Sequence, residues 1–335
     1  MVKFCVLGSG SQGNAVLLMT PRLHVLIDAG FPPDELAARM DGTGASWQSL
    51  HAVILTHTHA DHLCKRCLDF CVEHEIRFVC HERHAEQLGG GRYFKRLAKK
   101  NGLQTYDSNS FELRASAANG GRDAAFAAFA RHAPPADEAD TSGDVLRFHP
   151  IALPHDAPPT FGFRIEARTV PQASCLRVAE APPTYGERRL EASVANGWVK
   201  LGYLVDLGTC AEEVALAVAD VDLLALEFNH DELMERSSGR HPRLIQRVLS
   251  DDGHLSNRQA AEVFRKVLER NGNSGPEVLV QMHLSEDCNR AELAYQAAQE
   301  IVLLTGARTR VYSTRQHERG TVHEIRGAGI QAAQP

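Results

Sequence analysis

Residues 56–62 read Thr56-His57-Thr58-His59-Ala60-Asp61-His62, which places four potential metal ligands within six residues. The segment follows the apolar run Ala52–Leu55, so we expect it at the end of a β-strand, where α/β proteins build their sites. Two imidazoles spaced by two residues can converge on one cation, and the Asp-His pair that follows can turn towards a second. Histidine and carboxylate ligands suit Zn, Mn or Fe. The spacing therefore predicts a metal centre rather than a polar loop with chance histidines.

The composition is that of an ordinary globular protein, with 43% hydrophobic and 23% charged residues among 335. Lys and Arg number 36 against 42 Asp and Glu, and the net charge of −6 argues against a generally basic nucleic-acid coat. The chain carries 17 histidines, more than its six tyrosines and two tryptophans together. Because histidine is the commonest metal ligand, this excess agrees with a metal centre.

The sequence predicts a cytoplasmic protein without a membrane segment. No apolar run reaches the length of a membrane span, and no apolar signal-peptide core follows Met1. The eight cysteines are therefore expected to be reduced. Cys64, Cys67 and Cys71 share one face of the helix expected after His62. A buried face is favoured over a thiolate site, because three cysteines leave a tetrahedral site incomplete.

The order of apolar and amphipathic segments predicts a mixed α/β layered architecture. Apolar runs predict strands at Val2–Leu7, Ala15–Met19, His24–Asp28, Ala52–Leu55, Arg77–Cys80, Val145–Leu153, Phe161–Ala167, Gly202–Val205, Leu223–Phe228 and Val278–Met282. Helical periodicity appears after His62 and at Ala211–Ala219, Asn257–Arg270 and Ala291–Leu304. Residues 114–140 and 169–196 lack a sustained strand pattern and are interpreted as insertions.

A glycine-rich segment, Gly8-x-Gly10-x-x-Gly13, matches the dinucleotide-binding fingerprint on paper, with Asp28 about 20 residues further on. That fingerprint needs a helix directly after the loop. Here the β-type run Ala15–Met19 follows instead, so a tight turn between two strands is favoured. Polar residues of this turn are candidates for a place near the site: Ser9, Ser11 or Asn14.

The histidine segment resembles the His-x-His-x-Asp-His signature of the metallo-β-lactamase superfamily. Four further segments match that family in order and at predicted strand ends: Leu26-Ile27-Asp28-Ala29-Gly30, Pro154-His155-Asp156, Val205-Asp206-Leu207-Gly208 and Met282-His283-Leu284-Ser285. The resemblance implies a four-layer αββα sandwich, with residues 1–335 forming one domain that carries the two insertions.

The resemblance also implies two divalent metal ions, Zn or Mn. It assigns His57, His59 and His155 to one cation. It assigns Asp61, His62 and His283 to the other, with Asp206 bridging both and Asp28 bracing the histidine loop. An alternative for His155 is to orient another ligand. Coordination lowers the pKa of water towards about 7, so a hydroxide held between the cations is the expected nucleophile.

Three more motifs narrow the resemblance to the YycJ/WalJ branch: Gly8-Ser9-Gly10-Ser11-x-Gly13-Asn14-Ala15, Leu226-Glu227-x-Asn229-His230-Asp231 and Gly253-His254-Leu255-Ser256-Asn257. This branch is similar to phosphodiesterases and is associated with exonuclease activity on DNA, so the implied substrate is a phosphodiester, DNA above all. The chain departs from the branch at Cys288, where a polar residue is expected, and in its insertions. These departures bear on substrate specificity more than on metal binding.

The implied catalytic residues are Asp61, His230, Glu227 and Asp231. His230 would contact the phosphate or protonate the leaving oxygen, and Glu227 or Asp231 would fix its tautomer. Without the resemblance, a plain turn position is an equal interpretation of His230.

His254 and His283 share the triplet His-Leu-Ser, so sequence alone could exchange them. His283 follows a predicted strand and is taken as the ligand. His254 precedes a helix that Ser256 could cap, and it is taken as a substrate contact or a support for the ligands. The further candidates for substrate contact or ligand support are Asn229, Ser256, Asn257, Arg243 and Arg247, of which the arginines suit phosphate.

The leading function is therefore a dinuclear metal-dependent phosphodiesterase that acts as an exodeoxyribonuclease. Its alternatives are a thioester or carboxylic-ester hydrolase of the glyoxalase type and a non-catalytic metal-binding regulator. The Asn229-His230-Asp231 motif and the nearby arginines favour phosphodiesters. The complete ligand set argues against a regulator.

Overall fold

The computed structural model describes residues 1–100, 102–115, 143–170, 198–272 and 275–326. Within them, two seven-stranded β-sheets are present. The strands of the first sheet are β1 (Val2–Gly10), β2 (Gly13–Met19), β3 (His24–Ile27), β4 (Ala52–Ile54), β5 (Arg77–His81), β6 (Leu103–Tyr106) and β14 (Val322–Ile325). Those of the second are β7 (Phe111–Arg114), β8 (Val145–Leu153), β9 (Thr160–Arg168), β10 (Val199–Leu204), β11 (Leu223–Glu227), β12 (Val278–Met282) and β13 (Arg310–Ser313).

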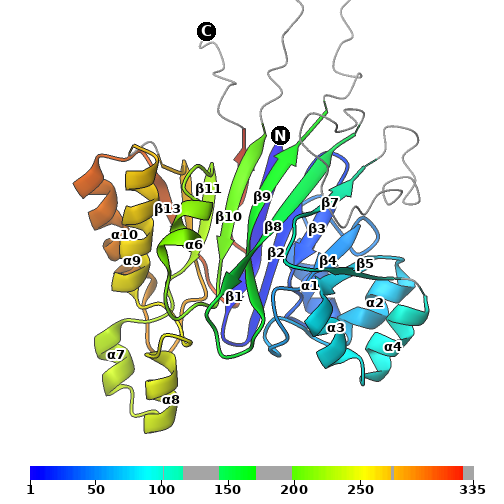
Figure 1. The fold of residues 1–335 in the computed structure, drawn as a ribbon, viewed down its shortest axis with the longest axis horizontal. Coiled ribbons are helices and arrows are strands. Elements are labelled where there is room, and N and C mark those ends of the chain that lie inside the picture. The colour runs from blue at the N-terminus through cyan, green and yellow to red at the C-terminus, as the bar shows by residue number, and fades with distance from the viewer. Residues whose placement is uncertain (101, 116–142, 171–197, 273–274, 327–335) are drawn as a thin grey trace, which may run out of the picture.

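Helices lie on the outer faces of both sheets (Figure 1). Those beside the first sheet are α1 (Pro33–Met40), α2 (Cys67–Glu73), α3 (Glu82–Leu88) and α4 (Arg92–Lys99). Those beside the second sheet are α6 (Glu212–Ala217), α9 (Asn257–Arg270) and α10 (Ala291–Thr305). A short pair, α7 (Glu232–Ser237) and α8 (Pro242–Val248), lies at the lower left of the view. The arrangement is the predicted αββα sandwich.

The two sheets have the same succession of antiparallel and parallel strands. The first has the order β14-β1-β2-β3-β4-β5-β6, and the second has the order β13-β12-β11-β10-β9-β8-β7. In each sheet an antiparallel run meets a parallel run, with the change at β3 and at β10. Because parallel strands all end at one edge of a sheet, the loops that follow them gather there.

Apolar side chains fill the space between the sheets. The largest of them are aromatic, and the rings of Phe111 and Phe148 stack with their centroids 5.1 Å apart. Each fully buried side chain of this size contributes about 1.5–3 kcal/mol to folding. Each sheet also packs against its own helices through one further apolar cluster. The rigid central layers therefore fix the positions of the loops at the strand ends.

The predicted glycine turn is confirmed, because β1 and β2 pair antiparallel from Lys3 opposite Met19 to Gly10 opposite Gly13. The dinucleotide-binding interpretation is therefore wrong. Strands β8 and β12 and helix α9 have the predicted bounds. Prediction missed the short elements β6, β7, β13, β14, α1, α3, α7 and α8.

Most of both predicted insertions, residues 114–140 and 169–196, lies outside the described residues. At their edges, Arg114 belongs to β7, which pairs with β8. Their role and the single-domain organisation remain predictions. Within the described residues, none of the helices is both long and apolar enough to cross a lipid bilayer.

Candidate metal centre

The predicted metal ligands come together at one edge of the sandwich, just beyond the ends of strands. His57 follows β4, His155 follows β8, Asp206 follows β10 and His283 follows β12. Their side chains are almost fully buried. Segments that are far apart in the sequence therefore meet because strand ends meet.

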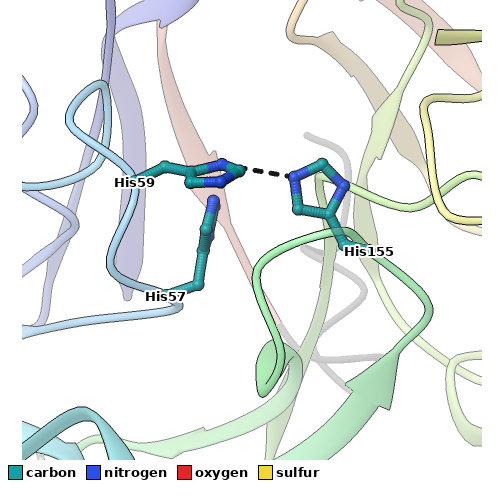
Figure 2. Close-up of side chains that lie close together, drawn as sticks. All are labelled: His57, His59 and His155. Carbon is teal, nitrogen blue, oxygen red and sulfur yellow. Dashed lines mark hydrogen bonds between the residues drawn. The ribbon is translucent and has the colours of Figure 1, made fainter. Parts of the chain in front are cut away.

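His57, His59 and His155 form the three-histidine cluster, in which one nitrogen of each ring lies within 4.8 Å of the others. Figure 2 shows the three rings facing one another, with His155 Nε2 3.4 Å from His59 Nδ1. His155 Nδ1 lies 3.1 Å from the carbonyl oxygen of Gly253, which can only accept a hydrogen bond. His155 Nδ1 therefore donates to this carbonyl oxygen, and Nε2 faces the cluster. This favours His155 as a ligand over the alternative of orienting one.

His57 offers the cluster a nitrogen with no protein partner. Its Nδ1 lies 3.1 Å from the hydroxyl of Thr56, whereas its Nε2 is buried without a hydrogen bond among the described residues. Burial, together with the neighbouring imidazoles of His62, His155 and His59, holds the pKa of His57 well below its ordinary value. A buried nitrogen left unpaired is rare in native proteins and fits a metal ligand.

Asp61, His62 and His283 form the acidic cluster, whose ligand atoms also lie within 4.8 Å of one another. Asp61 Oδ2 lies 3.5 Å from His62 Nε2 and 3.4 Å from His283 Nε2. The other ring nitrogen of His62 lies 2.8 Å from Asp28 Oδ2. Asp28 thus braces the histidine segment, as the resemblance implied.

Carboxylates dominate the electrostatics of the acidic cluster. Burial opposes charge on His283, but Asp206, Asp61 and Glu227 outweigh it and raise the pKa of His283 to about 10. The pKa of His62 is raised well above its ordinary value in the same way. The imidazoles in turn hold the pKa of Asp206 and Asp61 below the ordinary range. The carboxylates are therefore ionised and ready to bind a cation.

Asp206 lies between the two clusters. A carboxylate oxygen of Asp206 and one ring nitrogen each of His57 and His62 all lie within 4.8 Å of one another. His57 belongs to the three-histidine cluster and His62 to the acidic cluster. Asp206 Oδ2 is 2.9 Å from His62 Nε2, and Asp206 Oδ1 is 3.5 Å from His283 Nδ1. This is the place that a bridging carboxylate requires.

Glu227 is a buried carboxylate that orients two histidines. Its Oε1 accepts hydrogen bonds from His254 Nδ1 at 2.8 Å and from His283 Nδ1 at 3.0 Å. Its Oε2 accepts from the backbone N–H groups of Leu207 and Leu255. Although burial opposes it, the imidazoles of His254 and His283 lower the pKa of Glu227 to about 2. Glu227 therefore supports the ligands rather than His230, which was its predicted partner.

His254 belongs to the site. Its ring centroid is 5.1 Å from that of His155 and 5.1 Å from that of His283. Its Nδ1 also lies 3.6 Å from Asp206 Oδ1. Because Glu227 accepts from Nδ1, the other ring nitrogen is left for a ligand or substrate.

His230 lies outside both clusters. Its ring is buried, and neither ring nitrogen has a hydrogen-bond partner among the described residues. Burial lowers the pKa of His230. The expected contact with Asp231 is absent, because the carboxylate of Asp231 accepts from backbone N–H groups in the first turn of α7 instead.

Three other candidates hold the loops around the site. Asn229 donates from Nδ2 to the carbonyl oxygen of His283 at 2.9 Å. Ser256 caps α9, as predicted, by accepting from the backbone of Gln259. Asn257 exchanges two side-chain hydrogen bonds with Asn289, at 2.8 and 3.0 Å. Asn289 directly follows Cys288, so a polar amide is present one position beyond the predicted departure.

The glycine turn supplies two residues that sequence reasoning placed only loosely. Ser9 Oγ accepts from the backbone N–H of His283 at 2.8 Å and donates to Asn14 Oδ1 at 2.8 Å. Asn14 Nδ2 lies 3.0 Å from His62 Nε2 and donates to Asp61 Oδ2 at 3.3 Å. The turn between β1 and β2 therefore touches both histidines of the acidic cluster.

Backbone strain gathers at the same edge. Asp28, Asp206 and His283 have φ angles of 60°, 64° and 57°, in the left-handed region that L-residues seldom adopt. Such conformations persist where the surrounding structure holds them, and they are common at functional sites. Gly30 allows a close approach here, because a Cβ at that position would lie 1.8 Å from the carbonyl oxygen of Asp61.

The two candidate arginines differ in their relation to the site. Arg247 on α8 pairs with Asp156, with 2.6 Å between Nε and Oδ2. Arg243 on the same helix is exposed and has no ion pair among the described residues. Asp156 was not singled out from sequence, although its position directly after His155 was a usable signal.

The prediction of one buried helical cysteine face is confirmed for Cys67 and Cys71 and is wrong for Cys64, which lies outside α2. Cys67 and Cys71 are buried under α2, and Cys64 precedes that helix and is half-buried. Burial raises the pKa of Cys71 to about 12. Seven cysteines are free within the described residues.

The chemistry of the site fits a pair of divalent cations. Imidazole nitrogens and carboxylate oxygens converge in two clusters around Asp206, and the buried Nε2 of His57 has no hydrogen-bond partner in the part of the chain that the structure describes. This set of ligands suits Zn, Mn or Fe. The set contains no thiolate, which a softer ion prefers, and no backbone carbonyl, which a larger ion would use.

Fold and ligand set together define a metal-dependent hydrolase. The chain belongs to the family of beta-lactamase superfamily domains, whose sequence profile matches residues 24–283. The predicted superfamily is thereby confirmed.

Relatives with assigned activities are similar over most of the chain. The chain is 25% identical over 293 residues to the exodeoxyribonuclease WalJ of Streptococcus pneumoniae serotype 2 (strain D39), covering 88% of this chain and 85% of that protein. It is 25% identical over 302 residues to the exodeoxyribonuclease YycJ of Bacillus anthracis, covering 89% and 88%. In structure it is similar to the metallo-β-lactamase fold protein YhfI of Bacillus subtilis, with a TM-score of 0.55, 15% identity and coverage of 95% and 98%. The structural likeness shows the shared fold.

Proposed function

We propose that this protein is a dinuclear phosphodiesterase that acts on DNA as an exodeoxyribonuclease. The observation that carries the proposal is the place of Asp206 between the three-histidine cluster and the acidic cluster. The similarity to WalJ and YycJ over most of the chain supports DNA as the substrate. We retain the cytoplasm as the proposed location.

His57, His59 and His155 would hold one cation, and Asp61, His62 and His283 the other, with Asp206 shared. Bound divalent ions, Zn or Mn, would supply a water of lowered pKa and would neutralise charge on the phosphodiester. The protein contributes fixed ligand positions. Asp28 holds the ring of His62, and Glu227 holds that of His283.

Proton transfer to the leaving oxygen falls to His254 in this proposal. Its Nδ1 is anchored on Glu227, and its side chain is 11% exposed, so substrate can reach the ring. A histidine is suited to general acid work near neutral pH. His230, to which the resemblance assigned this role, is fully buried and outside both clusters. We assign it to support of the loop before α7.

Purified protein loaded with Mn or Zn tests the function on three substrates. We expect hydrolysis of bis-p-nitrophenyl phosphate and shortening of end-labelled DNA from its ends. A glutathione thioester should remain intact, since the alternative glyoxalase-type activity would cleave it. Hydrolysis of the thioester but of neither phosphodiester would overturn the proposal. Protein that binds both ions and cleaves nothing would instead favour a regulator.

A further inference from the structure

Asp156 borders the three-histidine cluster on its solvent side. Its Oδ1 lies 3.3 Å from His155 Nε2 and 3.7 Å from His59 Nε2. The Asp156 side chain is 28% exposed, so it touches both the cluster and the solvent. A negative charge at this rim faces any anionic substrate that approaches the cluster.

Arg247 lies beside Asp156 and balances that charge. Its Nε lies 2.6 Å from Asp156 Oδ2, so the two side chains form an ion pair. The Arg247 side chain is 51% exposed. Among the described residues, Asp156 is the only residue with which the Arg247 side chain forms an ion pair. Because a guanidinium has five N–H donors, the ion pair with Asp156 leaves donors of Arg247 for an anion.

We propose that Asp156 is a positioning residue that holds Arg247 at the rim of the three-histidine cluster, where the guanidinium binds the non-bridging oxygens of a substrate phosphodiester. The inference rests on the proposed function and names the residue pair that recognises its phosphate. A guanidinium matches two phosphate oxygens through parallel N–H···O bonds, which an ammonium does not.

The charges predict how the pair responds to substitution. Removing Arg247 deletes the phosphate contact and leaves the carboxylate of Asp156 facing the substrate. Neutralising Asp156 frees Arg247 from its position but keeps its positive charge near the site. Removing both charges deletes the contact and the repulsion together. The effects of the two residues are therefore coupled and do not add.

Two other arginines supply matched comparisons. Arg243 lies on the same helix, α8, and no carboxylate among the described residues holds it to the site. Arg308 is exposed and precedes β13, so it lies at the opposite end of the parallel strands from the ligands. Substitution of Arg243 tests whether any positive charge on α8 suffices for phosphate binding. Substitution of Arg308 tests the loss of one positive charge from the whole protein.

The experiment uses the full chain loaded with Mn, in the variants R247A, R247K, D156N, D156N/R247A, R243A and R308A. Bound Mn is counted by mass spectrometry, and calorimetry gives the dissociation constant of thymidine 5′-monophosphate. KM and kcat are measured on a DNA oligonucleotide. Because an exposed ion pair adds little to stability, all variants should fold.

We expect R247A to weaken nucleotide binding and raise KM about tenfold, with a smaller change in kcat, since charge-assisted hydrogen bonds to phosphate are lost. R247K and D156N should give smaller increases, and D156N/R247A should be no worse than R247A. R308A should match the unmodified protein, and every variant should keep its Mn.

Equal effects of R243A and R247A would overturn the proposal, because charge on α8 would then suffice. Loss of Mn in D156N would also overturn it, because Asp156 would then be a ligand. Unmodified protein that cleaves neither DNA nor bis-p-nitrophenyl phosphate would remove the proposed function, while the binding of thymidine 5′-monophosphate would still test the phosphate contact.

Discussion

The two ligand clusters are built from similar residues but have opposite electrostatics. The three-histidine cluster is short of hydrogen-bond partners, since His57 Nε2 has none among the described residues. Burial and neighbouring imidazoles lower the pKa of His57 and His59. In the acidic cluster, carboxylates raise the pKa of His62 and His283. The pKa of His57 and His59 is therefore lowered in the first cluster, whereas the pKa of His62 and His283 is raised in the second.

This difference predicts that metal binding releases different numbers of protons from the two clusters. A cation that enters the three-histidine cluster displaces no proton from His57 or His59 at pH 7, because the pKa of each is lowered. In the acidic cluster a cation must replace the protons of His62 and His283, whose positive charges now balance Asp61 and Asp206. Asp206 takes part in both clusters and is the residue that links them.

The variant D206N should have the largest effect, because Asp206 takes part in both clusters. An amide at this position keeps the shape but removes the negative charge that the two clusters share. We expect the bound metal to fall from two ions to one or fewer, and kcat/KM on bis-p-nitrophenyl phosphate to fall roughly 1000-fold, since metal ions supply several kcal/mol of transition-state stabilisation. Metal counting and steady-state kinetics measure both.

The matched control for D206N is D220N. Asp220 is a half-exposed carboxylate that pairs with Lys200 and Arg164 at a distance from the site. The D220N protein should keep both ions and full activity. D206N protein that retained two ions and unchanged activity would show that Asp206 does not bridge the clusters.

The next largest contrast separates His283 from His254. H283A removes a nitrogen from the acidic cluster, so we expect the loss of one ion and a fall in kcat/KM of about 100-fold or more. H254A should keep both ions but lose about 100-fold in kcat, the size of a general acid contribution. Metal counts distinguish the variants. Equal metal loss in both would show that His254 is a ligand and would undo the assignment.

The sequence predicted which side chains meet at the candidate site, because these side chains follow strand ends. Apolar runs such as Val278–Met282 and Val145–Leu153 mark strands, and the polar residue that follows each run is placed by the edge of the sheet. The histidine segment adds local spacing, and the matched family order adds the partners. Where a strand is long and apolar, its end is predictable from sequence alone.

The supporting contacts were not predictable in the same way. Glu227 was expected to orient His230, which is three residues away, but it binds His254 and His283, which are 27 and 56 residues away. Ser9 binds the backbone of His283 across 274 residues. Such contacts depend on the three-dimensional position of strand ends from two sheets, and local spacing contains no information on that. The missed strands β13 and β14 are short and half-exposed, so their apolar pattern is weak.

The pH dependence of metal uptake sharpens the comparison of the clusters. Binding to the acidic cluster must release a proton from His283, whose pKa is raised to about 10, so its affinity should rise with pH throughout the neutral range. Each of the two protons displaced, from His283 and from His62, contributes roughly a 100-fold increase in affinity between pH 6 and pH 8. The affinity of the three-histidine cluster should level off near pH 7, since the pKa of His57 and of His59 is lowered.

Equilibrium dialysis against Mn at pH 6, 7 and 8 measures both affinities. The expected curve has one uptake step that stays in place above pH 7 and one that moves to lower Mn concentration as pH rises. Two steps that moved in parallel would contradict the assignment of opposite electrostatics.

The smallest effect is expected from S9A, which tests whether the glycine turn supports the acidic cluster alone. The Ser9 hydroxyl accepts from the His283 backbone and donates to Asn14, and Asn14 contacts His62 and Asp61. Its removal should weaken Mn binding at the acidic cluster about tenfold, the lower end of the effects of groups that orient ligands. S11A, an exposed serine of the same turn, is the control. Equal weakening of both clusters in S9A would mean that the turn stabilises the whole edge, and the two clusters would then not be independently supported.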